Sequence, residues 1–180
     1  MEKNKIDSPT LIIFSGLPGV GKTTLAKAAA KEIGAAYLRI DTVEQTLRDL
    51  CDVQVEYEGY QLVHRIASEN LKLGLSVVAD SCNPLALTRD DWNQVAKQNG
   101  AHCINIEVIC GDKEEHRRRV ETRCSDVAGL MLPNWREVEG REYHEWASPR
   151  VVIDTSKITV RQSVKKLLTA LNIGYENIDE

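Results

Sequence analysis

The sequence predicts an α/β fold built on a parallel β-sheet. This prediction rests on the order in which strand-like and helix-like segments follow one another. Five short apolar segments alternate along the chain with longer segments in which apolar residues recur at helical spacing. Strands separated by helices in this way pair in parallel, because each helix returns the chain across a face of the sheet. The first apolar segment, residues 11–14, also runs directly into a glycine-rich loop and a helix-forming run. We therefore expect five parallel strands covered by helices on both faces.

The predicted elements follow one another without a repeat, a low-complexity stretch or a linker, so residues 1–180 are expected to form one domain. Residues 1–8 are expected to be a short flexible lead, and residues 51–59 an acidic turn. The expected strands cover residues 10–15, 36–40, 75–79, 102–109 and 151–153. The expected helices cover residues 23–34, 42–50, 60–73, 84–98, 112–124, 134–147 and 159–171.

Residues with strong preferences for helix ends set several of these boundaries. Gly34 is expected to close the first helix, since glycine adopts the left-handed conformation that ends many helices. Asp112 is expected to cap a very basic helix with its side chain. Thr42-x-x-Gln45 and Thr159-x-x-Gln162 both fit the capping-box pattern, so each is expected to begin a helix.

Composition limits the classes of function that are expected. A net charge of −4 provides no general attraction to nucleic acid or to an anionic membrane, although a local basic groove is compatible with it. The five cysteines are odd in number and lack C-x-x-C spacing, which favours reduced thiols over disulfides or a metal site. No apolar run approaches the length of a membrane span, and the N-terminus lacks the apolar part of a signal peptide. We therefore expect a cytoplasmic protein.

One loop fits the phosphate-binding pattern G-x-x-x-x-G-K-[ST] at every fixed position. Its glycines let successive backbone N–H groups point into one concavity, and the next helix adds its positive N-terminal end. Lys22 is then expected to reach the β- and γ-phosphates, and the Thr23 hydroxyl to bind Mg²⁺. The residues expected to hold ATP here are Gly16, Leu17, Pro18, Gly19, Val20, Gly21, Lys22, Thr23 and Thr24.

Two acidic residues follow predicted strands, at the edge of the sheet where ligands of such folds bind. Asp80 follows an apolar strand, and we expect it to hold Mg²⁺ directly or through water; capping the next turn is the alternative. Asp41 follows the second strand, 19 residues after Lys22. Phosphoryl transfer to an alcohol needs a carboxylate that orients the hydroxyl and accepts its proton, and we expect Asp41 to be this base. A role as a helix cap would also explain its position.

The basic helix carries Arg119 and Arg123 four residues apart, so both lie on one helix face. A loop with Gly129 and Pro133 follows, which is typical of a mobile lid. We expect residues 124–147 to form the lid and a following helix, with Arg119 or Arg123 stabilising charge on the transferring phosphoryl group. A solvated helix with paired charges is the alternative.

Other side chains leave two interpretations open. Arg89 is expected either to bind an anionic substrate or to form a surface ion pair with a neighbouring aspartate. Trp135, Tyr143 and Trp146 have the spacing of one helix face, and core packing is favoured over stacking on a base. The histidines lack the spacing of metal ligands and are expected to be structural or exposed.

Taken together, these motifs resemble those of P-loop kinases of the nucleoside- and metabolite-kinase group, over nearly the whole chain. The loop Asp80-x-x-Asn83-Pro84 with Arg89 downstream is similar to the corresponding loop of phage-type polynucleotide 5′-kinases. This resemblance implies that Asp80, Asn83 and Arg89 face the acceptor. It also implies a sheet order of 2-3-1-4-5 and contact between adenine and the turn that contains Thr155. An alignment with Thr42 in place of Asp41 at the base position stays open.

These features favour an ATP- and Mg²⁺-dependent kinase that phosphorylates a hydroxyl of a small metabolite or nucleotide. The segment 124–147 lacks a four-cysteine zinc pattern, and the chain has no Asp-Gly-x-Pro-Arg segment, so AMP is not expected as the acceptor. A polynucleotide 5′-hydroxyl kinase is the alternative within the enzymes, and an ATP-binding regulatory or adaptor module is the alternative outside them. The oligomeric state and the preference for ATP over GTP stay open.

Overall fold

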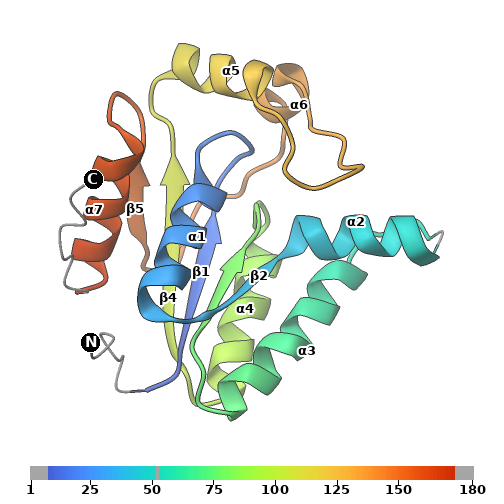
Figure 1. The fold of residues 1–180 in the computed structure, drawn as a ribbon, viewed down its shortest axis with the longest axis vertical. Helices are drawn as coiled ribbons and strands as arrows, with labels where there is room; N and C mark the ends of the chain where they lie inside the picture. Colours follow the sequence, from blue (N-terminus) through green and yellow to red (C-terminus); the bar gives the residue numbers. More distant parts are fainter. Residues whose placement is uncertain (1–7, 52, 173–180) are drawn as a thin grey trace.

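A five-stranded parallel sheet in the order β2-β3-β1-β4-β5 runs through the part of the chain described by the computed structural model, residues 8–51 and 53–172 (Figure 1). The strands are β1 (Thr10–Ser15), β2 (Ala36–Arg39), β3 (Val77–Asp80), β4 (His102–Ile109) and β5 (Val151–Asp154). The helices are α1 (Lys22–Ile33), α2 (Ile40–Cys51), α3 (Glu58–Lys72), α4 (Ala86–Gln98), α5 (Lys113–Thr122), α6 (Trp135–Glu139) and α7 (Val160–Ala170). The predicted fold class and strand order are confirmed. The flexible lead expected over residues 1–8 falls, except for Ser8, outside the described residues.

The alternation of side chains along β1 divides the core into two layers. Ile12 and Phe14 pack with apolar residues of α1 and α7 on one face of the sheet. Leu11 and Ile13 pack with residues of α3 and α4 on the other. All four side chains are fully buried, as expected for a central strand of a parallel sheet with both faces covered. This arrangement holds the chain rigidly up to Ser15, immediately before the glycine-rich loop.

All five strands end at the same edge of the sheet, and the chain segments that follow them meet there. β1 lies between β3 and β4, so the glycine-rich loop after β1 is flanked by the segments after those two strands. Helices α5 and α6 lie across this edge, above the loop between β1 and α1 (Figure 1). The strand-end residues predicted to be functional therefore come from neighbouring segments.

The expected caps form at three helix ends and fail at one. Gly34 has φ 68° and closes α1, Asp112 accepts hydrogen bonds from two backbone N–H groups of α5, and Thr159 begins α7 with a capping box. The capping box predicted at Thr42 is wrong, because α2 already begins at Ile40, which leaves Thr42 inside the helix. Ile40 is buried in the core, so the chain turns into the helix directly from the end of β2.

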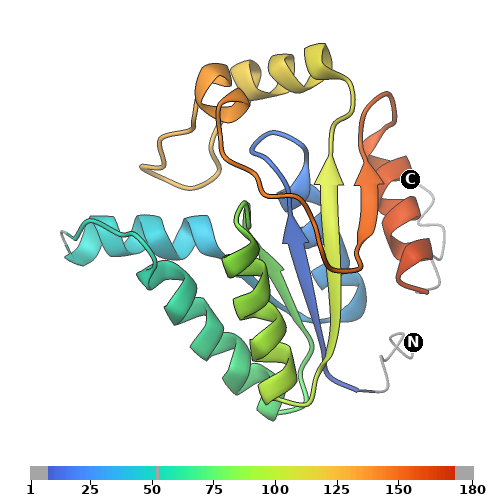
Figure 2. The ribbon, with the colours of Figure 1, turned by 180° about the vertical axis from the view of Figure 1, so that it is seen from behind.

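The helix expected over residues 134–147 is also shorter than predicted. α6 ends at Glu139, and the residues after Gly140 run without regular structure to β5 (Figure 2). Trp135 packs edge-on against His116 of α5, with ring centroids 5.2 Å apart. Tyr143 and Trp146 instead stack on the guanidinium of Arg89, at 4.8 and 4.2 Å. The predicted single aromatic face is wrong, because α6 ends at Glu139 and the two aromatic residues beyond it contact Arg89 rather than His116.

Arg89 fastens the segment after α6 to the start of α4. Its side chain is buried, and it donates hydrogen bonds to the backbone carbonyls of Asn83, Pro84, His144 and Glu145 at 2.9–3.3 Å. A guanidinium with this many acceptors and two aromatic faces is already satisfied by the protein. The expected alternatives of substrate binding and a surface ion pair are therefore both wrong for Arg89.

Replacing Arg89 with methionine is expected to lower the free energy of unfolding by about 2–4 kcal/mol, because buried carbonyls would lose a charged donor. Urea denaturation measures this loss, with Arg65→Met on the exposed side of α3 as the control. An unchanged midpoint for Arg89→Met would mean that the stacked guanidinium contributes no net stability.

No helix within the described residues is both long enough and apolar enough to cross a membrane.

Candidate active site

The glycine-rich loop curves where its glycines adopt positive φ angles that other residues rarely take. Gly16, Gly19 and Gly21 have φ values of 134°, 87° and 96°. A Cβ atom on Gly16 would lie 2.1 Å from the Val108 carbonyl oxygen, and one on Gly19 would lie 2.6 Å from the Val120 side chain. Both positions therefore need glycine for space as well as for conformation. The loop therefore packs closely on β4 and α5, and its Gly16 N–H donates to the Cys82 carbonyl oxygen at 3.1 Å.

Lys22 and Thr23 stand at the start of α1, beside this loop. Lys22 is nearly buried, and its Nζ donates to the Leu17 carbonyl oxygen at 3.1 Å. This contact uses one of the three protons of the ammonium group, so two remain for phosphate oxygens. Thr23 lines the adjoining cavity together with Lys22. These residues fit the pattern of a phosphate site with a hydroxyl available for Mg²⁺.

A cavity of about 1000 Å³ opens beside the loop. Its walls come from the glycine-rich loop, α1, α2, the end of α5 and the segment between α5 and α6. The residues expected to be functional that line it are Pro18, Gly19, Gly21, Lys22, Thr23, Thr24, Asp41, Arg119, Arg123 and Thr155. The tertiary structure thus brings the phosphate loop, the candidate base and both lid arginines to one space.

Asp41 lies in the first turn of α2 and lines this cavity, whereas Thr42 does not. Arg39 Nη2 lies 3.5 Å from Asp41 Oδ2. The Asp41 side chain keeps 44% of its surface exposed, so a substrate hydroxyl can reach the carboxylate. Of the two residues left open for the base position, the geometry therefore favours Asp41.

Asp80, Asn83 and Arg89 do not line the cavity. Asn83 is fully buried with φ 43°, and its amide donates to Phe14 O and Ser15 Oγ at 3.1 Å. It ties the segment after β3 to the end of β1, and the expectation that it faces the acceptor is wrong. Asp80 is also buried and accepts a 2.7 Å hydrogen bond from Tyr37. Burial, and then the Asp80 carboxylate, raise the pKa of Tyr37 above its ordinary value.

Helix α5 is anchored on the phosphate loop by a residue that sequence reasoning set aside. His116 is buried, and its Nε2 lies 2.8 Å from the Pro18 carbonyl oxygen. Val120, one turn later, packs above Gly19. The first turns of α5 are therefore part of the loop's own support.

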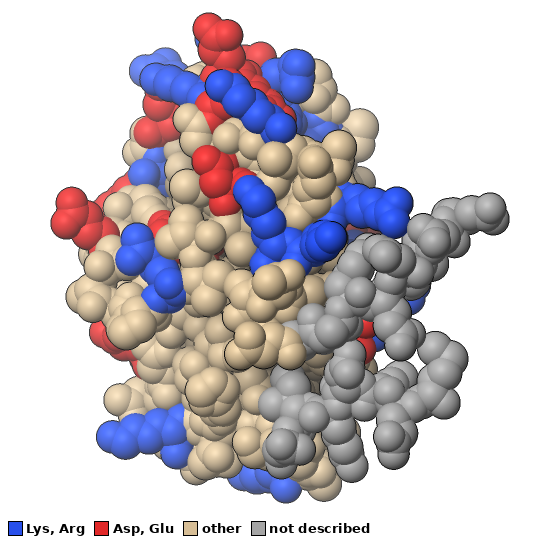
Figure 3. Space-filling model, turned by 90° about the vertical axis from the view of Figure 1, so that its left-hand side faces the viewer, with Lys and Arg blue, Asp and Glu red and all other residues tan. Residues whose placement is uncertain are grey.

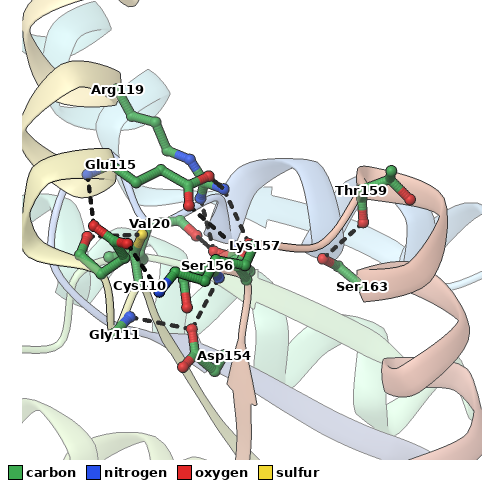
Figure 4. Close-up of polar contacts among 12 residues, drawn as sticks. Val20, Cys110, Gly111, Glu115, Arg119, Asp154, Ser156, Lys157, Thr159 and Ser163 are labelled. Atoms are coloured by element: carbon green, nitrogen blue, oxygen red, sulfur yellow. Dashed lines mark hydrogen bonds and ion pairs between the residues drawn. The ribbon is translucent and has the colours of Figure 1, made fainter.

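Arg119 joins α5 to the turn after β5 (Figure 4). Its guanidinium donates to the Thr155 hydroxyl at 2.8 Å and to the Thr155 carbonyl oxygen at 3.0 Å, and pairs with Glu115 at 2.6 Å. The Thr155 hydroxyl in turn donates to the Val20 carbonyl oxygen at 2.8 Å. Asp154 accepts from the backbone N–H groups of Gly111 and Ser156 and fixes the same turn. Arg119 is thus held at the wall beside Thr155.

Arg123, by contrast, has donors without partners. It follows the last residue of α5, and its Nε and Nη2 are buried with no hydrogen-bond partner among the described residues. Burial lowers the pKa of its guanidinium below the ordinary value, and the like charges of Arg141 and Arg39 add to this effect while Asp41 opposes it. An anionic ligand in the cavity would supply the missing acceptors.

The segment between α5 and α6 covers the cavity and contacts α1, β2 and α2. Asp126 pairs with Lys27 and with Arg39, both at 2.6 Å. These two hydrogen bonds lower the pKa of Asp126 to about 2. A Cβ on Gly129 would lie 3.0 Å from the Gln45 amide, so the segment also packs closely on α2. Residues 123–126 and 129–133 of this segment therefore line the cavity, and the mobile lid stays a prediction.

Residues 11–128 match the AAA_33 family, described as an AAA domain. The chain belongs to this family. An adenylyl-sulfate kinase of Shewanella baltica strain OS185 is 26% identical over 189 residues, with 95% of this chain and 87% of that protein covered. The L-seryl-tRNA(Sec) kinase of Methanococcus maripaludis is 27% identical over 168 residues, covering 88% of this chain and 64% of that protein.

Among solved structures, the Mycobacterium tuberculosis APS kinase CysC in complex with AMPPNP and APS has the same fold as this AAA_33 protein. The TM-score is 0.65 at 16% identity, and 92% of this chain and 98% of that chain are covered. The predicted relationship to small P-loop kinases is confirmed by the family and its relatives.

Sequence reasoning did not place several charged residues at this AAA_33 site, among them Lys27, Arg39, Asp126 and Arg141. Arg39 had a usable signal, since it ends β2 two residues before Asp41 and so lies at the ligand-binding edge. The other three lie in a helix and in irregular segments, where sequence spacing does not show which side chains face the cavity.

Proposed function

We propose that this protein is an ATP- and Mg²⁺-dependent kinase that transfers the γ-phosphate to a hydroxyl group of a small molecule. The observation that carries the proposal is the shared cavity, which Asp41 and Arg123 line together with Lys22 and residues of the phosphate loop. A carboxylate, a guanidinium without acceptors and a phosphate cradle are the parts that phosphoryl transfer to an alcohol requires. The kinase relatives support the same reaction class.

The donor side of the cavity has the groups that ATP and Mg²⁺ require. The backbone of residues 16–21 would bind the phosphates, with Lys22 as the compact positive charge. Thr23 would bind Mg²⁺, and Asp80 would act on it through water, because this carboxylate is buried and does not line the cavity. No group of three or more metal-ligating side chains exists among the described residues. A hydroxyl and one carboxylate nevertheless suit Mg²⁺, which keeps several waters and binds phosphate oxygens.

On the acceptor side, Asp41 would orient the substrate hydroxyl and accept its proton as the oxygen attacks. Arg123 would donate its unpartnered N–H groups to the transferring phosphoryl group, where negative charge spreads in the transition state. Arg119 already bonds to Thr155 and Glu115, so its proposed role is to hold the wall of the nucleotide site. Of the two lid arginines, the proposal therefore assigns the phosphoryl contact to Arg123.

The decisive experiment is a screen of small alcohols and short oligonucleotides for acceptor-dependent release of ADP. Lys22→Ala is the blank, and its turnover is expected to fall by at least about 100-fold, since one electrostatic stabiliser of the transition state is lost. Lys31→Ala, an exposed change on the same helix, is the control and is expected to keep full turnover. ADP release that no acceptor stimulates would favour the ATP-binding regulatory or adaptor module instead.

The oligonucleotide arm tests the polynucleotide 5′-hydroxyl kinase. Asn83 and Arg89, which suggested that kinase, are occupied with the protein's own backbone. On the face seen in Figure 3, acidic and basic side chains lie side by side at the end formed by α5, and they form no continuous basic surface there. Binding of oligonucleotides that falls steeply with salt would be needed to favour this alternative over a small acceptor.

A further inference from the structure

The cavity is far more positive than the chain that contains it. Its lining holds seven cationic side chains and three carboxylates, which leaves four positive charges in excess. The whole protein has a net charge of −4. The cations are Lys22, Lys27, Arg39, Arg48, Arg119, Arg123 and Arg141, and the carboxylates are Asp41, Glu44 and Asp126.

Several of these cations have roles or partners that account for them. Lys22 belongs to the phosphate loop, and Arg119 is held between Thr155 and Glu115. Arg48 pairs with Glu44 along α2. Lys27 pairs with Asp126. Arg39 also pairs with Asp126 and Asp41, but its buried Nε has no partner among the described residues. We group it with Arg123 and Arg141, which line the same cavity.

This group of three arginines, the arginine cluster, has donors that the protein leaves without acceptors. Nε of Arg39 and both Nε and Nη2 of Arg123 are buried and lack a hydrogen-bond partner among the described residues. The guanidinium of Arg141 is on an exposed residue and makes no hydrogen bond or ion pair within the described part of the chain. Buried charged donors without acceptors are costly, so a built site for a ligand is the physical explanation.

The cluster lies on the acceptor side of the cavity and already accommodates carboxylates. Arg39 pairs with Asp41, the proposed base, at 3.5 Å, and with Asp126 of the covering segment at 2.6 Å. Asp41 and Asp126 together supply two negative charges to a group of four cations that includes Lys27. A further anion is therefore favoured at this point, and the planar fork of a guanidinium is suited to the paired oxygens of an oxyanion.

We propose that the phosphate acceptor is itself an anion, whose oxyanion group binds the cluster of Arg39, Arg123 and Arg141 while its hydroxyl reaches Asp41. The acceptor class is thus a hydroxyl compound that carries a phosphate, sulfate or carboxylate group. This inference rests on the proposed function and adds the chemical class of the second substrate. Neutral alcohols such as sugars and nucleosides lack the group that the cluster would bind.

The test separates the acceptor site from the phosphate loop. The protein is first saturated with Mg²⁺ and AMPPNP, which occupies the loop, and inorganic sulfate is then titrated by calorimetry. We expect one sulfate to bind, with affinity lowered at least about tenfold by Arg39→Gln and by Arg141→Gln, since each removes a charged donor. Arg117→Gln is the matched control, because Arg117 is an exposed residue of α5 that pairs with Glu121 outside the cavity.

The outcomes distinguish this inference from the proposed function. If AMPPNP fails to bind, the proposed function fails at its donor half and this inference, which rests on it, fails as well. If AMPPNP binds and sulfate does not, or if all three variants weaken sulfate equally, the inference is overturned while the kinase proposal stands. Arg141 lies at the surface, so its variant is expected to fold even where Arg39→Gln does not. In the acceptor screen, hits that are neutral alcohols would also overturn the inference that the acceptor is an anion.

Discussion

Replacing Asp41 with asparagine is expected to lower kcat for acceptor phosphorylation about 10²- to 10⁴-fold, the usual contribution of a positioned base. The amide keeps the size of the carboxylate but cannot accept the proton of the substrate hydroxyl. The affinity for Mg·ATP is expected to change by less than about threefold, because Asp41 stands on α2 rather than on the phosphate loop. Steady-state kinetics together with titration of AMPPNP measure both quantities.

Asp49→Asn is the matched control for this change. It removes the same charge from the same helix two turns later, at an exposed residue that does not line the cavity. Its kcat is expected to equal that of the unaltered protein. Full turnover in Asp41→Asn would show that another group accepts the proton. An equal loss in both variants would point to the general charge of α2 instead.

The second large effect is expected on stability, from Gly16→Ala. The new Cβ would lie 2.1 Å from the carbonyl oxygen of Val108, a backbone atom of strand β4 that is paired with β1 and β5 and cannot easily move aside. Gly16 also has φ 134°, which an alanine rarely adopts. The clash and the backbone strain together are expected to lower the free energy of unfolding by about 2–6 kcal/mol.

Gly74→Ala separates these two causes. Gly74 has φ 80°, but a Cβ there would have no atom within 4 Å, so only backbone strain remains. Its expected loss is about 1–2 kcal/mol. Urea denaturation of the two variants, compared with the unaltered protein, gives both values. Equal losses would show that the approach of Gly16 to β4 carries no cost of its own.

Of the four helix caps predicted from short stretches of sequence, three form in the structure. The caps at Gly34, Asp112 and Thr159 each involve backbone groups within a few residues, so sequence alone contains the interaction. Thr42 fits an equally good capping pattern and failed. Burial of Ile40 in the core started the helix two residues earlier, which a local pattern cannot show.

The residues after β3 show that local patterns also failed to predict which side chains lie at the site. The pattern of Asn83 and Arg89 predicted a place on the acceptor side, but both side chains are buried and bonded to the backbone. The acceptors for Arg89 include His144 and Glu145, more than fifty residues away in the sequence. Such a contact has no local signature, and it occurs where a long helix was expected around Tyr143 and Trp146.

By itself the sequence determined the order of strands and helices, the parallel pairing of the strands and the phosphate loop from Gly16 to Thr23. These features arise from apolar periodicity and from backbone conformations that neighbouring residues impose. Only the tertiary structure decided that Arg39, Arg123 and Arg141 line the same cavity as Asp41 and that Arg119 is held against Thr155. A long charged side chain can form hydrogen bonds with water on almost any exposed face, so local sequence does not fix where it lies. Which of them face the cavity therefore depends on packing between segments that lie far apart in the chain.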